Sequence, residues 1–344
     1  MLNGHHGGND LGLDIEIDFS ANLNPLGMPE AVRGAVIRSA DEWERYPDPC
    51  CRRLRSKLAE KLGVPFERIV CGNGADDLIY RIVSALRPEK ALVCSPSFSE
   101  YGKALSENRC VVIEHFLRED SSFRLTQSIL EDIEGNDIVI LASPNNPTGL
   151  LVEPVLLERI AMQCLRKGAY LLCDESFIGF AGNSGERTAL NCMNESVIVL
   201  RSFTKLFAMA GLRLGYAVCG SIAAAERIAD TGQYWSVSAP AQAAGAAALD
   251  EADHVRKTIG LIKNEREYLA AELAGMGVKV FPSDVNYILF KARKELGGLL
   301  LKDKILIRSC ADYSGLGDDY FRVAVRTKRE NMQLAAAIRR ILNG

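Results

Sequence analysis

The sequence lacks the features that mark several classes of protein. Its ten cysteines include no C-x-x-C pair and no cluster with histidine, so we expect neither a disulfide framework nor a metal site. No run of basic residues occurs and the net charge is −3, which argues against nucleic-acid binding. No apolar run is long enough to span a membrane, and the N-terminus lacks the basic start of a signal peptide. We therefore expect a cytoplasmic protein that acts on a small molecule.

The sequence does contain the alternation of strand-like and helix-like segments that is typical of an α/β fold. Short apolar runs near residues 70, 92, 140, 172, 199 and 215 alternate with segments of helical periodicity. These runs are rich in Val, Ile and Leu on both faces, which is typical of strands buried between layers of helices. The pattern predicts a mostly parallel central sheet between helices, with functional residues at the strand ends.

The 344 residues exceed one average domain. After Pro240 the sequence pattern changes. It predicts an Ala-rich helix, a long charged helix, short strands and a final amphipathic helix. We predict an N-terminal arm over residues 1–35, which contributes to the small domain and the active site. A large domain over 36–240 and a smaller α+β domain over 241–344 complete the prediction.

The segment RSFTK, which ends at Lys205, follows one of the predicted strands. A lysine there is costly to bury unless it is paired, neutral or used covalently, and imine chemistry needs a neutral amine. Ser202 can donate a hydroxyl nearby, and Arg213 offers a guanidinium suited to a phosphate. For Lys205 taken alone, a solvated lysine at a strand end remains the alternative.

Polar residues also follow three other predicted strands. Asp174 needs a cationic partner if it is buried, although a helix cap is an equal alternative. The amide of Asn146 can bind a ring oxygen and a carboxylate together. Gly74, Ala75 and Asp76 form a glycine-rich step into a helix, where backbone N–H groups can hold a phosphate and Asp76 can cap or charge-match the helix.

Together these residues resemble the aspartate-aminotransferase-like family of pyridoxal-phosphate enzymes of fold type I. The match in order and spacing covers Asn146, Asp174, Ser202, Lys205 and Arg213. The resemblance implies pyridoxal 5'-phosphate as cofactor and a homodimer with shared active sites. It implies that Lys205 forms the imine with the cofactor and that Asp174 binds the pyridine nitrogen, and both are expected to be catalytic.

The same resemblance implies further cofactor contacts. Phe98 matches the residue that stacks on the cofactor ring, and Tyr46 matches the tyrosine that reaches the partner subunit's cofactor phosphate. Without the family match, Phe98 is a core aromatic and Tyr46 a surface residue. The group expected at the phosphate of the same subunit comprises Gly74, Ala75, Asp76, Ser202 and Arg213.

Within this family the chain resembles most the threonine-phosphate decarboxylases of cobalamin biosynthesis, and next the histidinol-phosphate aminotransferases. The motifs are HGGN at 6–9, DFSANLNPLGMP at 18–29, LRSFTK, WSVSA at 235–239, ILIRSCADYSGL and YFRVAVR. The resemblance implies a small phosphorylated amino acid, phosphothreonine, as substrate. Its expected contacts are His6, Gly7, Asn24, Asn146, Arg308 and Arg322.

One departure concerns the reaction. The aminotransferases usually carry a tyrosine where this chain has Phe177, and phenylalanine cannot donate a hydrogen bond to the cofactor's ring oxygen. This difference favours decarboxylation over transamination. The alternatives are an aminotransferase for histidinol phosphate or an aromatic amino acid, and a non-enzymatic binding module on the same fold. The sequence does not decide between phosphothreonine and phosphoserine, because one methyl group changes binding by only about 1–3 kcal/mol.

Overall fold

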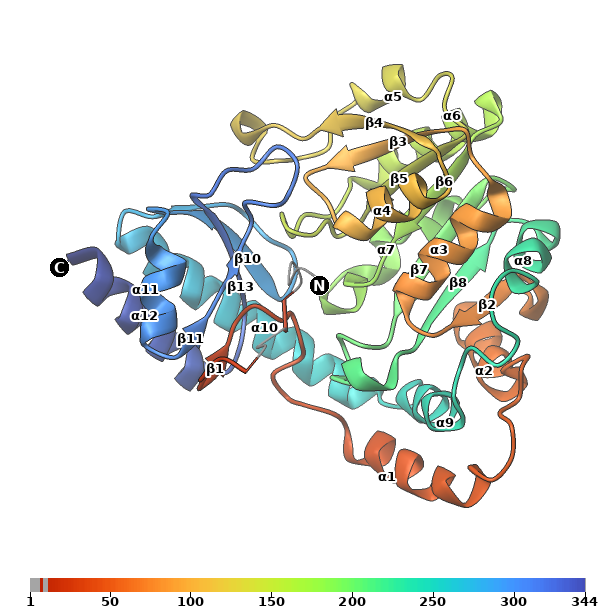
Figure 1. The fold of residues 1–344 in the computed structure, drawn as a ribbon, viewed down its shortest axis with the longest axis horizontal. Helices are drawn as coiled ribbons and strands as arrows, with labels where there is room; N and C mark the ends of the chain where they lie inside the picture. The colour runs from red at the N-terminus through yellow and green to blue at the C-terminus, as the bar shows by residue number, and fades with distance from the viewer. Residues whose placement is uncertain (1–6, 9–11, 344) are drawn as a thin grey trace.

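A seven-stranded sheet forms the centre of the larger part of the molecule (Figure 1). The computed structural model describes residues 7–8 and 12–343. All strands of this sheet run parallel except β8, which is antiparallel to both of its neighbours. The spatial order is β2 (Ile69–Gly72), β8 (Gly215–Cys219), β7 (Val197–Ser202), β6 (Tyr170–Asp174), β5 (Ile138–Ala142), β3 (Lys90–Ser95) and β4 (Val111–Phe116). Six of these strands and the mostly parallel sheet were predicted, and both predictions are confirmed.

The strands are apolar on both faces because each face packs against helices. Leu172 of β6 points to a cluster with α3 (Ala75–Leu86), α4 (Ser99–Glu107) and α8 (Ile222–Ala229). Its neighbours Leu171 and Cys173 point to the opposite cluster, with α5 (Ile129–Asp132) and α6 (Pro154–Lys167). This two-residue alternation is the geometry of a strand between two layers. The predicted buried thiols Cys94, Cys173 and Cys219 all lie in these clusters.

One detail differs from the expectation, and a second decides between two alternatives. Strand β4 lies at the edge of the sheet with Val111, Ile113 and Phe116 exposed, so its pattern is not that of a strand buried on both faces. At the start of α3 the N-cap position is held by Gly74, with no side-chain cap. Asp76 therefore does not cap the helix; it supplies negative charge to the first helical turn.

A second, four-stranded sheet is antiparallel throughout and follows residue 240 in the chain. Its order is β12 (Arg308–Ser309), β13 (Tyr320–Ala324), β10 (Tyr287–Lys291) and β9 (Lys279–Val280). It shares a core with α10 (Ala252–Gly275), α11 (Leu296–Lys302) and α12 (Lys328–Asn343). The N-terminal segment joins this part, because β1 (Ile17–Asp18) pairs in parallel with β11 (Ile305–Leu306). The domain limits at residues 35 and 240 stay predictions.

The remaining helices α1 (Glu30–Arg38), α2 (Arg52–Leu62) and α9 (Ala239–Ala248) lie together beside the first sheet (Figure 1). A short helix, α7, spans Ser184–Arg187. Turns of 3-10 helix occur at Ser39–Glu42, Phe66–Arg68, Glu119–Ser121, Ile178–Phe180, Ala189–Cys192 and Ala210–Leu212. Within the described part of the chain, no helix combines the length and the apolarity that a membrane crossing requires.

Candidate active site

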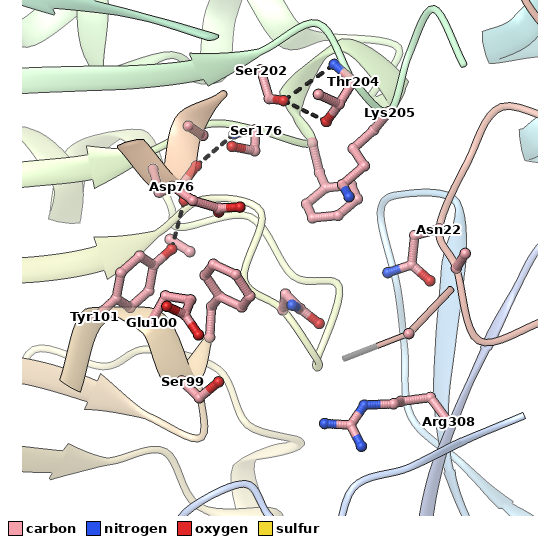
Figure 2. A pocket seen from close by; sticks show the side chains of 18 of the residues that line it. Asn22, Asp76, Ser99, Glu100, Tyr101, Ser176, Ser202, Thr204, Lys205 and Arg308 are labelled. Carbon is pink, nitrogen blue, oxygen red and sulfur yellow. Dashed lines mark hydrogen bonds between the residues drawn. The ribbon is translucent and has the colours of Figure 1, made fainter. Parts of the chain in front are cut away.

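A cavity of about 1040 Å³ opens where the carboxyl ends of β5, β6 and β7 face the second sheet and the N-terminal segment (Figure 2). Ligands of open α/β sheets bind in this position, beyond the carboxyl ends of the strands. The cavity brings together most of the predicted site residues, which come from segments far apart in the sequence. Those that line it are Gly7, Ala75, Asp76, Phe98, Asn146, Asp174, Phe177, Ser202, Lys205, Arg213, Arg308 and Arg322.

The amine of Lys205 projects into this cavity from the segment that follows β7 (Figure 2). Burial is the main cause that lowers the pKa of Lys205 below its usual value, and the positive charges of Arg322 and Arg213 act in the same direction. No described residue forms a hydrogen bond or an ion pair with its Nζ atom. An amine that is enclosed, unpaired and easily deprotonated is suited to nucleophilic attack on a carbonyl carbon.

Asp174 lies at the end of β6 and is only 5% exposed. Its Oδ2 atom accepts a hydrogen bond from the Tyr101 hydroxyl at 2.7 Å, and its Oδ1 atom accepts one from the backbone N–H of Ser176 at 2.8 Å. Burial raises the pKa of Asp174 above its usual value, although these hydrogen bonds oppose the shift. No described cation forms a salt bridge with it, so the carboxylate lacks the partner that buried charges usually have.

The N-terminus of α3 meets Arg213 at one end of the cavity. Gly74 has a φ of +93°, and a Cβ atom there would lie 2.7 Å from Nη2 of Arg213. The same Nη2 atom lies 3.0 Å from Oδ2 of Asp76. The hydroxyls of Ser202 and Thr204, which are 2.7 Å apart, line the cavity as well. A helix N-terminus, two hydroxyls and a guanidinium form a group of donors suited to a phosphate.

Arg322 lies on β13 and is 5% exposed. Its Nη1 donates to Oδ1 of Asn146 at 2.5 Å, and its Nη2 donates to the backbone oxygen of Ser20 at 2.6 Å. The buried Nε atom has no hydrogen-bond partner. Gly7 lies so close to this group that a Cβ atom there would collide with the oxygen of Ser20. The guanidinium is therefore anchored by neutral groups and keeps its charge for an anionic ligand.

A second arginine, Arg308, reaches the cavity from β12 (Figure 2). Its Nη2 atom lies 2.6 Å from Oδ2 of Asp312, and its guanidinium carbon lies 5.2 Å from the centre of the Tyr313 ring. Burial is the largest single effect and lowers the pKa of Arg308, but the hydrogen bond to Asp312 and the neighbouring acidic groups together outweigh it, so the net shift is upward. Arg308 and Arg322 thus present two guanidinium groups from the second sheet, in addition to that of Arg213.

Two predicted substrate contacts, His6 and Asn24, are not among the described residues that line the cavity. His6 lies outside the described residues. Asn24 does not line the cavity, because its Nδ2 atom donates to the Leu206 oxygen and the Thr258 hydroxyl, both at 2.7 Å. These bonds join the N-terminal segment to the segment after β7 and to α10. Asn22, two residues earlier, lines the cavity instead, and its buried Oδ1 atom has no hydrogen-bond partner.

Tyr46 also lies away from the cavity of its own subunit. Its side chain is 77% exposed and stacks on Trp235, with ring centroids 4.2 Å apart. It borders a separate hollow of about 850 Å³ between α1, α2 and α9. The expectation that it serves a partner subunit stays a prediction.

Several residues of the site had no signal in the sequence that singled them out. Tyr101 was hidden in a helical pattern, and Ser176, Thr204 and Asn22 looked like ordinary strand-end or turn residues. Asn22 shares the DFSANLNP motif with Asn24, so the motif identified the segment but not the residue. Phe98 lines the cavity with its ring edge-on to Tyr101, at 5.7 Å between centroids.

The fold and this site place the protein in a known class: the chain belongs to the family Aminotransferase class I and II, whose sequence model matches residues 14–341. It is 40% identical to the threonine-phosphate decarboxylase of Salmonella typhimurium, over 100% of this chain and 98% of that protein. It is 33% identical to the adenosylcobalamin biosynthesis bifunctional protein CobDQ of Leptospira interrogans, covering 98% of this chain and 41% of that protein. The crystal structure of the histidinol-phosphate aminotransferase from Clostridium acetobutylicum superposes with a TM-score of 0.90 at 28% identity, over 95% of this chain and 99% of that one.

Proposed function

We propose that the protein is a pyridoxal-phosphate-dependent decarboxylase that converts L-threonine O-3-phosphate to (R)-1-aminopropan-2-yl phosphate in cytoplasmic cobalamin biosynthesis. The observation that carries this proposal is the cavity in which the unpaired amine of Lys205 and the buried carboxylate of Asp174 face two arginines. The 40% identity to a threonine-phosphate decarboxylase over the whole chain supports the choice of reaction.

The residues of the cavity fit the proposed cofactor. The buried Asp174 lacks a cation, which a protonated ring nitrogen would supply. The group around Gly74, Ser202 and Arg213 offers the donors that a phosphate requires, and glycine at position 74 leaves the room that Arg213 occupies. Lys205 carries the amine to which the aldehyde carbon can bond. When bound, pyridoxal phosphate would withdraw electrons from the substrate's Cα atom.

The two arginines account for the two anionic groups of the substrate. Phosphothreonine carries a carboxylate and a phosphate, and charge-assisted hydrogen bonds contribute about 1.5–3 kcal/mol each. We assign Arg308 and Arg322 to these groups, with Gly7 and Asn22 beside them. Asn146 accepts from Arg322 through Oδ1, so its Nδ2 group is the part that can donate to a ligand. Asn22 replaces Asn24 in this set.

The reaction depends on which bond at Cα lies perpendicular to the ring, because only that bond overlaps the π system. The anchored guanidinium of Arg322 can hold the carboxylate in a fixed direction. Lys205, once its amine is free and has taken up a proton, can deliver that proton to Cα after CO₂ leaves and so return to the neutral form. Phe177 is 8% exposed, packs edge-on to Tyr287 at 5.0 Å, and offers no hydroxyl to the site. Phe177 therefore covers that side of the cavity with an apolar ring and no hydrogen-bond donor.

The test is to supply the purified protein with pyridoxal phosphate and phosphothreonine, without a keto acid. We expect release of CO₂ and formation of the amino phosphate in equal amounts. Exchange of amino groups between glutamate and a phosphorylated keto substrate, with no CO₂, would instead establish the histidinol-phosphate aminotransferase activity that the similarity to the Clostridium structure favours. Phosphoserine, tested beside phosphothreonine, measures the selectivity for the extra methyl group.

We further propose that the protein is a homodimer in which Tyr46 reaches the cofactor phosphate of the partner subunit. Two observations support this assignment: Tyr46 lies outside the cavity of its own subunit, and it forms an exposed aromatic pair with Trp235. Exposed aromatic side chains are typical of protein interfaces.

A further inference from the structure

We propose that Tyr101 is a positioning residue that keeps the Asp174 carboxylate ionised and oriented for the ring nitrogen of the cofactor. Tyr101 lies in the first turn of α4 and is 1% exposed. Its hydroxyl reaches across to β6 and donates to Oδ2 of Asp174 at 2.7 Å (Figure 2). This inference rests on the proposed binding of pyridoxal phosphate.

The carboxylate depends on this hydrogen bond because its surroundings disfavour its charge. Burial is the main cause that raises the pKa of Asp174, and the negative charge of Asp76 on α3 adds to it. The hydrogen bonds from Ser176 and Tyr101 lower the pKa again. With no cation paired to Asp174 in the described part of the chain, removal of either donor leaves a buried carboxylate oxygen without a partner.

The other titratable groups near Asp174 do not replace Tyr101. Tyr287 on β10 donates its hydroxyl to the backbone oxygen of Asn145, and Cys173, which precedes Asp174 on β6, points to the opposite core. The amine of Lys205 interacts with Asp174 only through its charge. Burial, together with the neighbouring Asp174, raises the pKa of Tyr101 well above its usual value. Tyr101 therefore stays a neutral donor over the whole working range of pH.

Tyr101 also contacts a second wall of the cavity. Its ring meets the ring of Phe98 edge-on, with an interplanar angle of 84°. Phe98 lines the cavity at the position expected for stacking on the cofactor. A Tyr101→Phe substitution keeps this ring contact and removes only the hydroxyl, so it separates the hydrogen bond from the packing.

The experiment measures the affinity of the apoprotein for pyridoxal phosphate between pH 6 and 8, by fluorescence or absorbance titration. Without the donor, Asp174 stays protonated to higher pH, and the neutral acid cannot pair with a protonated ring. We expect Tyr101→Phe to bind about tenfold more weakly than wild type near pH 6, with the difference shrinking as the pH rises. Tyr320→Phe is the matched control, because it removes a tyrosine–carboxylate hydrogen bond to Glu119 outside the cavity.

A double-mutant cycle shows whether Tyr101 acts through Asp174. In an Asp174→Asn background, Tyr101→Phe should cause no further loss of affinity. A cofactor analogue with C–H in place of the ring nitrogen should likewise bind equally to wild type and Tyr101→Phe. If Asp174→Asn does not fold, this analogue replaces the double-mutant cycle as the test. Equal affinity of wild type and Tyr101→Phe at every pH, or an equal loss with the analogue, overturns the inference alone. If the wild-type apoprotein does not bind pyridoxal phosphate, the proposed function fails as well.

Discussion

Lys205 and Phe177 show how single side chains set the chemistry of the cavity. The amine of Lys205 is reactive because burial and two nearby guanidinium groups make its charged form costly. The ring of Phe177 closes the cavity beside Tyr287 without offering a proton. Lys205 thus supplies a nucleophile, and Phe177 leaves its side of the cavity without a hydrogen-bond donor.

Replacing Lys205 tests the nucleophile. We expect Lys205→Ala to lower the rate of CO₂ release by at least about a thousandfold, because the residue both bonds the cofactor and moves a proton. Borohydride treatment of the wild type should attach the cofactor permanently to the peptide that contains Lys205, as mass spectrometry can show. Attachment to any other lysine contradicts the assignment.

Replacing Phe177 by tyrosine tests the missing donor. A phenol that donates to the ring oxygen of the cofactor stabilises the anionic form of that oxygen. We therefore expect the pH midpoint of the absorbance change of the bound cofactor to fall in Phe177→Tyr. An unchanged midpoint means that the new hydroxyl does not reach the cofactor. Phe180→Tyr is a suitable control because Phe180 is buried outside the cavity.

At the scale of elements, the carboxyl ends of β6 and β7 are joined by a buried ion pair. Glu175 directly follows Asp174, and Arg201 directly precedes Ser202. The Glu175 side chain is fully buried, and its Oε2 atom accepts from Nη2 of Arg201 at 2.8 Å. Further bonds to Glu175 come from the Thr188 hydroxyl and the Ala189 N–H. The pair therefore fixes the two strand ends that carry the site residues.

Breaking this ion pair should reduce stability strongly. Glu175→Ala leaves the guanidinium of Arg201 without its partner, which costs about 3–5 kcal/mol in buried pairs. The expected result is a lower midpoint in urea denaturation of the apoprotein. The double variant Glu175→Leu/Arg201→Met replaces both charges with apolar groups and should recover most of the loss. No recovery in the double variant means that Glu175 stabilises the fold through Thr188 and Ala189 instead.

At the scale of the whole molecule, the two sheets and the N-terminal segment enclose the cavity jointly, while Tyr46 borders a separate hollow. The hollow beside Tyr46 is lined by α1, α2 and α9 and has a volume of about 850 Å³. If the active sites are shared, as we propose, each site is complete only in the dimer. Isologous dimers of this kind bring the same surface from both subunits together.

Mixing two defective variants tests the shared site. A dimer of one Lys205→Ala subunit and one Tyr46→Ala subunit contains one intact site. In that site the Tyr46→Ala subunit supplies Lys205 and the Lys205→Ala subunit supplies Tyr46. Random reassociation of equal amounts should restore about a quarter of wild-type activity. Trp43→Ala, which changes an exposed aromatic residue outside the hollow, serves as the control partner. No recovery on mixing, with dimers present in sedimentation, contradicts the shared site.

The periodicity of the apolar residues determined the central sheet. Strands buried on both faces must be apolar throughout, so all six were visible in the sequence. The edge strand β4 was not, because its exposed face relaxes that requirement. The reactive residues Lys205, Asp174 and Asn146 were visible too, since each follows an apolar strand and matches a family motif.

Only the tertiary structure decided which polar side chains enter the cavity. Asn22 and Asn24 stand in one motif, but Asn24 bonds to Thr258 of α10, whereas Asn22 lines the cavity. The hydrogen bond from Tyr101 to Asp174 joins residues 73 positions apart. The physical reason is that local patterns specify burial and secondary structure, whereas a hydrogen bond between distant residues depends on how the strands and helices pack in three dimensions.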